Sequence, residues 1–310
     1  MVSPEEMCSE ALGCFQTDPG RSYELFQKAA EQGHPNGMFG MAELKRMGLG
    51  TEKDVPGAYG LYEAAASCGV PQAMYRLGEL CSGMYGYTAD PERCREWFLA
   101  AAREGMPQAF PEIAEILLNG YGGEPDPSGA FQWFGKAAEY GDPHSIYRMG
   151  LMKEEGHGTE KDPAKAEALI RKSADMGLRE AQFLMASRIV SGEYVGSEQE
   201  AVSLYESASS QGMTVATVNL ATLYYDGQKV ERDLPKAFSL YSQAAEAGDP
   251  DAQFIAGRML LEGTGVEKDA EKGFALIGKA AASGNEPAMQ IVSQLRRAQN
   301  AQIIKIDGLD

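Results

Sequence analysis

The motif Ala-Ala-x-x-Gly, with serine in place of one alanine in two copies, recurs at a nearly constant interval along the whole 310-residue chain. Successive copies are 36 residues apart, except for one interval of 35. The glycines of the copies are Gly33, Gly69, Gly105, Gly141, Gly177, Gly212, Gly248 and Gly284. A fixed period of this length is typical of a tandem array in which each unit buries its apolar face against its neighbours.

Each repeat is predicted to contain two helices separated by a glycine-containing loop. In the unit from 72 to 107, Leu77 and Leu80 share one face of a 3.6-residue period, which predicts a first helix. Asp90 followed by Pro91 is a typical N-cap and first helical residue, which predicts a second helix. The equivalent caps of the whole array are Asp18, Asp54, Asp90, Asp126, Asp162, Ser197, Asp233 and Asp269.

A small residue recurs in the middle of each first helix, where a larger side chain would push two crossing helices apart. These residues are Ala42, Gly78, Ala114, Gly150, Ala186, Ala221 and Gly257. The second helices carry a large aromatic residue at a matching position, as at Tyr62 and Phe98. We therefore expect each pair of helices to cross closely around an aromatic side chain.

These patterns predict an all-α fold, a right-handed α/α superhelix (solenoid) of about seven to eight 36-residue helix-hairpin repeats. We expect residues 1–310 to form a single repeat domain. Within it we expect an N-terminal capping helix over 1–17, tandem repeats over 18–287, a C-terminal capping helix over 288–301 and a tail over 302–310. The tail alternates apolar and polar residues, which predicts an extended segment that folds back on the last repeat or docks on a neighbouring molecule.

Two copies carry the fullest set of repeat motifs. The unit Ala252–Gly284 contains Gly-Thr-Gly-Val-Glu-Lys-Asp at 263–269, and the unit Ala216–Gly248 contains Pro-Lys-Ala at 235–237 and Ala-Ala at 244–245. These motifs resemble the Sel-one-like repeat (SLR) family, a relative of the tetratricopeptide repeat. The resemblance implies an adaptor or scaffold that binds peptides or proteins, and it implies no reaction.

The charge balance bears on the class of partner. The chain has 28 lysines and arginines against 45 acidic residues, for a net charge of −17. This balance argues against binding to nucleic acid and against docking on an anionic membrane. The chain also lacks a run of about 18 apolar residues, so we expect no membrane insertion.

The N-terminus shows neither a basic start nor an apolar core, so no signal peptide is predicted and a cytoplasmic location is expected. A chain whose leader had been removed would look the same, which leaves a periplasmic or secreted location open. A monomer is expected.

The residues that usually carry catalysis are scarce. The five cysteines form no Cys-x-x-Cys pair, and only three histidines occur, at His34, His144 and His157. The chain contains no Ser-x-x-Lys and no Gly-x-Ser-x-Gly motif. We therefore predict that the protein is not an enzyme and that it has no metal site and no cofactor.

The candidate binding residues lie on the first helices, which line the concave surface in related solenoids. One slot of the first helix contains Arg76, Glu112 and Arg148 in successive repeats and Asn219 two repeats later. A second slot, three residues further along, contains Glu43, Glu79 and Glu115 in successive repeats and Arg258 in a later one. Asparagine in the first slot could hold a ligand backbone through its amide donor and acceptor. An alternative interpretation is that Arg76, Glu79 and Arg148 form ordinary solvated ion pairs. The predicted groove therefore comprises Arg76, Glu79, Glu112, Glu115, Arg148, Asn219 and Arg258.

The sequence thus predicts a protein- or peptide-binding adaptor or scaffold that uses this concave surface. Two alternatives remain open: an envelope enzyme acting on β-lactam or peptidoglycan peptides, and a self-associating structural protein that uses its last helix and the tail at 303–310.

Overall fold

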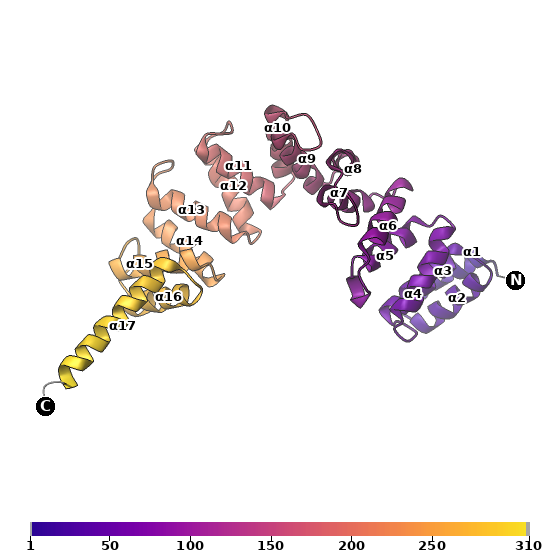
Figure 1. Ribbon diagram of the computed structural model, residues 1–310, viewed down its shortest axis with the longest axis horizontal. Helices are drawn as coiled ribbons and strands as arrows, with labels where there is room; N and C mark the ends of the chain where they lie inside the picture. Colours follow the sequence, from indigo (N-terminus) through magenta and orange to yellow (C-terminus); the bar gives the residue numbers. More distant parts are fainter. Residues whose placement is uncertain (1, 308–310) are drawn as a thin grey trace. The chain divides into compact units, whose positions relative to one another are not determined.

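The computed structural model describes the backbone of residues 2–307 and the side chains of residues 2–297. Over this range it consists of α-helices, one short 3-10 helix and loops, without a β-strand (Figure 1). The chain divides into two compact units, residues 1–166 and 167–310, each described by itself. The predicted all-α fold of helix-hairpin repeats is confirmed. The prediction of a single domain over 1–310 stays a prediction.

The N-terminal unit contains the first nine helices, and α10 (Pro163–Asp175) spans the division between the units. The elements of the N-terminal unit are α1 (Pro4–Cys14), α2 (Pro19–Glu31), α3 (Pro35–Met47), α4 (Val55–Ser67), α5 (Pro71–Cys81), η1 (Met84–Gly86), α6 (Pro91–Arg103), α7 (Ala109–Asn119), α8 (Pro127–Glu139) and α9 (Pro143–Glu155).

The C-terminal unit contains the remaining helices, which are α11 (Arg179–Ser191), α12 (Glu198–Ser210), α13 (Thr214–Asp226), α14 (Leu234–Glu246), α15 (Pro250–Glu262), α16 (Ala270–Ala282) and α17 (Glu286–Asp307). Odd-numbered helices are the first helices of their hairpins and even-numbered helices are the second helices.

The second helices begin where the cap residues predict. The Asp90 carboxylate accepts the backbone N–H of Arg93 at 3.1 Å, and Pro91 is the first residue of α6. Ser197 caps α12 in the same way by accepting the N–H of Glu200 at 3.1 Å. Such a cap satisfies one of the free amides of the first turn and stabilises a helix by about 1 kcal/mol.

The small residues of the first helices lie where two helices cross, as predicted. A Cβ atom at Gly78 would lie 2.8 Å from the ring of Phe98 on α6. A Cβ atom at Gly257 would lie 2.9 Å from the carbonyl oxygen of Gly273 on α16. Since real Cβ atoms do not approach other atoms so closely, glycine sets the distance between the two helices of these hairpins.

The loop between the two helices of a hairpin also contacts the preceding repeat. Gly50, at φ +67°, has no room for a Cβ atom because it lies against the backbone of Pro19, the first residue of α2. Gly122 lies in the same way against Pro91, the first residue of α6. The Gly-x-Gly part of the loop therefore packs on the start of the previous second helix.

The loop of the third hairpin, residues 82–90, is built differently. Helix α5 ends at Cys81, and Gly83 takes the left-handed conformation with φ 93°. Tyr85 follows with φ 58°, and it is the one non-glycine residue with a positive φ within 2–307. A non-glycine residue in this region costs about 1 to 2 kcal/mol, so other contacts must hold the loop in this form.

The two ends of the chain differ from each other. Helix α1 begins with a capping box, in which Ser3 and Glu6 each accept the other's backbone N–H.

At the C-terminal end the prediction of an extended tail after residue 301 is wrong, because α17 continues as a helix to Asp307 and runs beyond α15 and α16 in Figure 1. Neither proline nor glycine occurs between Pro287 and Gly308 to end the helix. The predicted fold-back concerns side chains outside the described residues.

Among the described residues, none of the helices combines the length and the apolar character that a membrane span requires.

Candidate binding surface

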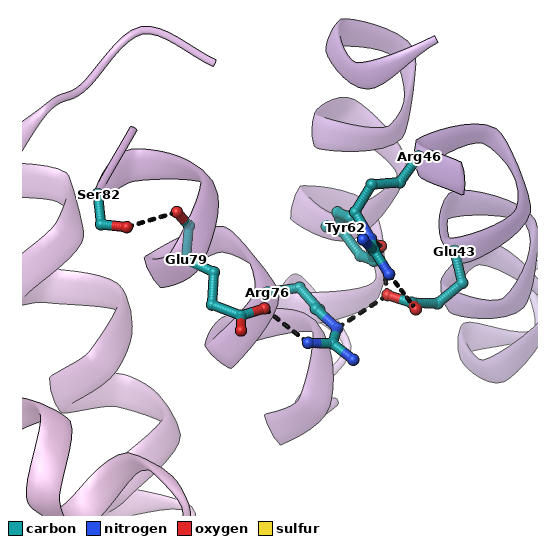
Figure 2. A network of polar contacts seen from close by, with 6 residues as sticks. All are labelled: Glu43, Arg46, Tyr62, Arg76, Glu79 and Ser82. Atoms are coloured by element: carbon teal, nitrogen blue, oxygen red, sulfur yellow. Dashed lines mark hydrogen bonds and ion pairs between the residues drawn. The ribbon is translucent and has the colours of Figure 1, made fainter. Parts of the chain in front are cut away.

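The first helices of the N-terminal unit are joined by a chain of charged side chains (Figure 2). Arg76 on α5 donates from Nε to Oε1 of Glu43 on α3 at 2.9 Å. The same guanidinium reaches Glu79, one turn further along α5, at 2.6 Å. Arg76 therefore bridges two successive repeats, and it does so between carboxylates whose side chains are only 12% and 13% exposed.

Glu43 is the carboxylate of this network that has the most partners. Arg46 donates to its carboxylate at 2.9 Å, and the hydroxyl of Tyr62 donates to its other oxygen. Burial alone would raise the pKa of Glu43, but the hydrogen bonds from Arg46 and Tyr62 and the charge of Arg76 outweigh it and lower the pKa. Glu43 is therefore held as a carboxylate by partners from α3, α4 and α5.

A second pair repeats this geometry further along the unit. Arg148 on α9 lies with Nε 2.7 Å from Oε1 of Glu115 on α7. Its Nη2 donates to Oε2 of the same carboxylate at 2.9 Å. Like Glu43 and Arg76, these partners are 33 residues apart. We call the residues at these two slots, Glu43, Arg76, Glu79, Glu112, Glu115 and Arg148, the ion-pair ladder.

The ladder is interrupted at Glu112 on α7. This slot holds arginine in the repeats before and after it, and the residue 33 positions earlier is the carboxylate of Glu79. Within the described residues, no ion pair or hydrogen bond to the Glu112 side chain is found. Desolvation and the charges of Glu79 and Glu115 raise the pKa of Glu112, while His144 acts in the opposite direction. Glu112 is thus an exposed carboxylate without a cationic partner.

The C-terminal unit presents a more neutral surface. Asn219 on α13 donates to the hydroxyl of Tyr205 on α12 at 3.3 Å, and the Ser187 hydroxyl lies 2.9 Å from the same oxygen. Asn219 and Thr222 line a cavity of about 280 Å³ together with Tyr205 and Asp226. The side-chain amide of Asn219 therefore lies at a hollow that is large enough for a small polar group.

Arg258 is on α15 of the same unit and forms a salt bridge with Glu262 at 2.9 Å. Both side chains are half-exposed, so this is an ordinary solvated pair within one helix. It is not among the residues that line the Asn219 cavity.

The structure thus groups the predicted residues into two sets. Arg76, Glu79, Glu112, Glu115 and Arg148 share the first-helix surface of the N-terminal unit, whereas Asn219 and Arg258 belong to the other unit. The expected ion pairs of Arg76 and Arg148 are present. Arg76 pairs with Glu79 within α5, and each arginine also pairs with a glutamate of the preceding repeat, in partly buried surroundings.

Sequence reasoning missed Arg46 and Tyr62 as members of the network. It placed Glu43 in the same slot as Glu79 and Glu115, at the 36-residue spacing, but did not include Glu43 among the predicted binding residues. The role of the Tyr62 hydroxyl has no such signal, because aromatic residues at this position are equally explained by packing.

Groups that could support catalysis or metal binding are few. Cys8 lies with Sγ 3.5 Å from Nδ1 of His34, whose Nε2 is 3.6 Å from Glu5. Burial and the charge of Glu5 raise the pKa of the Cys8 thiol, which is the opposite of what a thiolate nucleophile requires. Within the described part of the chain, no three His, Cys, Asp or Glu side chains are grouped so as to hold a metal ion.

Comparison with known protein families finds one repeat family along residues 6–285. The Sel1 repeat pattern matches eight segments of the chain, at residues 6–34, 35–70, 71–106, 112–142, 143–178, 179–213, 214–249 and 250–285. Among curated proteins, none shows a significant match.

Solved structures show the same architecture. A Sel1 repeat protein from Oxalobacter formigenes is 25% identical, with a TM-score of 0.80 over 94% of this chain and 86% of that one. The protective antigen c5321 of uropathogenic Escherichia coli, which displays an SLR fold, is 23% identical, with a TM-score of 0.61 over 96% of this chain and 73% of that one.

Proposed function

The chain belongs to the Sel1 repeat family, and we propose on that basis that it is a non-enzymatic scaffold that binds a segment of another protein on its first-helix surface. Repeat arrays of this kind commonly serve as protein-interaction scaffolds, since stacked repeats present one continuous surface to an extended partner. A net charge of −17 favours a protein partner over nucleic acid and suits a partner that carries basic residues.

The observation that carries the proposal is the unpaired carboxylate of Glu112. The neighbouring carboxylates Glu43, Glu79 and Glu115 each have an arginine partner within 3 Å, so their charges are already compensated inside the protein. Glu112 lacks such a partner although it stands between Glu79 and Glu115. A lysine or arginine from a bound segment would occupy the position that arginine holds elsewhere in the ladder, and it would form a charge-assisted hydrogen bond there.

The test is substitution of Glu112 by the residue that the ladder itself uses at this slot. Glu112→Arg places a guanidinium within reach of Glu79, as Arg76 is placed toward Glu43, so we expect the variant to be at least as stable as the wild type. The matched control is Glu246→Arg, which changes charge by the same amount at the exposed last residue of α14 in the other unit.

Both variants and the wild type would be used to capture partners from a native lysate, after their thermal melts are compared. We expect Glu112→Arg to lose a partner that the wild type and Glu246→Arg both retain. Equal capture by all three proteins would contradict the proposed surface.

We further propose a cytoplasmic location and a monomeric state for the protein. Fractionation of cells that express the native gene, and sedimentation of the purified chain, would test these two points.

A further inference from the structure

One repeat position of the N-terminal unit exposes a large apolar side chain in three consecutive hairpin loops. Leu49, Tyr85 and Tyr121 are 36 residues apart, and they are 39%, 42% and 38% exposed. We call these three residues the loop row. In the following repeats the same loop position holds polar residues, which are His157, Glu193, Gln228 and Thr264. Exposed apolar residues at one position of successive repeats indicate an interaction surface more strongly than scattered ones do.

The middle residue of the loop row is held against the ion-pair ladder. The guanidinium carbon of Arg46 lies 4.5 Å from the centre of the Tyr85 ring, a cation–π contact. Arg46 in turn donates to Glu43 of the ladder. The loop places Tyr85 there at the cost of a left-handed backbone with φ 58°, and a non-glycine residue in that conformation is often found where function requires it.

Tyr75 on α5 directly precedes Arg76 of the ladder. Burial raises the pKa of Tyr75 to about 12, and the charges of Glu112 and Glu79 act in the same direction. Its ring packs edge-on against Phe98 at 5.3 Å, which fixes its position. The contacts of Tyr85 with Arg46 and of Arg46 with Glu43 therefore join the apolar row to the ladder on the same unit.

We propose that the loop row and Glu112 form one docking surface for a partner segment that carries apolar side chains next to lysine or arginine. The apolar side chains of the partner pack on Leu49, Tyr85 and Tyr121, and its basic side chains pair with Glu112. This inference rests on the proposed function and adds the chemistry of the partner. Charge complementarity selects this partner, since an acidic segment would be repelled by the net negative charge of the unit's ladder.

The test uses three fluorescein-labelled 12-residue peptides, with alternating lysine and leucine, lysine and serine, or glutamate and leucine. Binding to the full chain would be followed by fluorescence anisotropy at 0.15 M salt, where non-specific attraction between exposed charges is screened. We expect the lysine–leucine peptide to bind at least tenfold more tightly than the lysine–serine peptide and the glutamate–leucine peptide not to bind. Equal binding of the two leucine peptides would overturn the charge requirement.

The loop row would then be altered in a Leu49→Ser, Tyr85→Ser, Tyr121→Ser triple variant. Val195→Ser is the matched control, since Val195 is an exposed apolar residue in a hairpin loop of the other unit. The triple variant should lose the tenfold preference for leucine, and the control should keep it. Tyr85→Gly is a second variant that removes the ring and relieves the backbone strain, so weaker binding by this variant cannot be attributed to misfolding.

The two proposals fail in different ways. If Glu112→Arg loses the lysine–leucine peptide while the triple variant keeps its tenfold preference, the first-helix surface stands and the loop row is wrong. If Glu112→Arg binds both lysine peptides as the wild type does, the role of Glu112 in the proposed function and in this inference is wrong.

Discussion

The guanidinium of Arg148 on α9 contacts both carboxylate oxygens of Glu115 on α7, at 2.7 Å and 2.9 Å, and so connects two consecutive repeats. Arg76 and Glu43 form the equivalent connection two repeats earlier. Side-on contact of a guanidinium with a carboxylate is geometrically demanding. These pairs therefore restrict the register between neighbouring first helices, in addition to the apolar core beneath them.

Glu43→Gln should lower the free energy of unfolding by about 3 kcal/mol, because it leaves the shielded guanidinium group of Arg46 without its carboxylate partner and leaves Arg76 with Glu79 alone. Urea unfolding would measure the change. Glu262→Gln is the control, since its pair with Arg258 is half-exposed, and it should cost less than about 0.5 kcal/mol. Equal effects of the two substitutions would contradict the structural role of the ladder.

The same variant has a defined pH dependence. The pKa of Glu43 is lower in the folded protein than its ordinary value of 4.5, so its contribution to stability is present above that value. It is lost as the pH falls through the folded pKa. The difference between wild type and Glu43→Gln should therefore shrink when unfolding is measured at pH values progressively below 4.5. A difference that stays constant down to strongly acidic pH would contradict this assignment.

Glu112→Gln should change the stability in the opposite direction. The pKa of Glu112 is raised above 4.5 by desolvation and by Glu79 and Glu115, so the wild type loses stability as the pH rises through the interval above that value. The variant should be slightly more stable than the wild type at neutral pH, by well under about 1 kcal/mol because water screens this exposed group. The two proteins should become equal below pH 4.5. Parallel thermal melts at both pH values would check this.

A comparison of two repeats of the C-terminal unit predicts a stabilising substitution. Gln182 donates to a backbone carbonyl and accepts from the amide of Gln211 at 2.9 Å. Gln253 is its equivalent two repeats later, but its Oε1 is buried without a hydrogen-bond donor. The position equivalent to Gln211 there is Ser283, the C-cap of α16, whose side chain is shorter.

Ser283→Gln should supply the missing donor and raise the free energy of unfolding by about 1 kcal/mol. Gln211→Ser is the reciprocal change and should lower it by a similar amount. Thermal unfolding of the two variants would measure both effects, and a shift of the same sign in both would refute the equivalence of the two positions.

Two glycines of one hairpin should respond to alanine in opposite directions. Gly257→Ala introduces a methyl group within 3 Å of α16 and should cost about 2 kcal/mol. Gly278, within α16, has no atom within 4 Å of an added Cβ, so Gly278→Ala should add roughly 0.5 to 1 kcal/mol through the helix propensity of alanine. Denaturant midpoints of the two variants would test this, and a stable Gly257→Ala protein would show that the helices can separate without cost.

The helices and their caps could be predicted from the sequence because their signals are local. Asp90 accepts from a residue three positions away, and the apolar period lies within one helix. The eight copies reinforce each local signal. Nothing local stops a helix at residue 301, and this is why the alternating pattern of the tail was misleading and α17 continues to Asp307.

The ion pairs that join successive repeats in the ladder could not be predicted from local sequence signals. Its pairs join residues 33 positions apart, three short of the repeat period, so their contact depends on how far successive first helices are offset. The sequence identified the slots of Arg76 and Arg148 and the pair of Arg76 with Glu79, but not the partners of the two arginines in the preceding repeats. The strained loop at Tyr85 could not be predicted either. The glycine that ends the first helix in other repeats corresponds to position 84, but in this repeat the glycine is at Gly83, and the loop conformation follows from this shift.

The contact between Gly50 and Pro19, and its repetition between Gly122 and Pro91, has a consequence for how such a chain can change in length. A loop of this kind packs on the start of a helix that belongs to the previous repeat, so a cut within that period separates two surfaces that fit each other. Whole periods can be duplicated or deleted with every such contact restored at the new junction. Variation in the size of proteins built this way should therefore proceed in steps of one repeat. The one 35-residue interval of this chain contains a loop that lacks the second glycine.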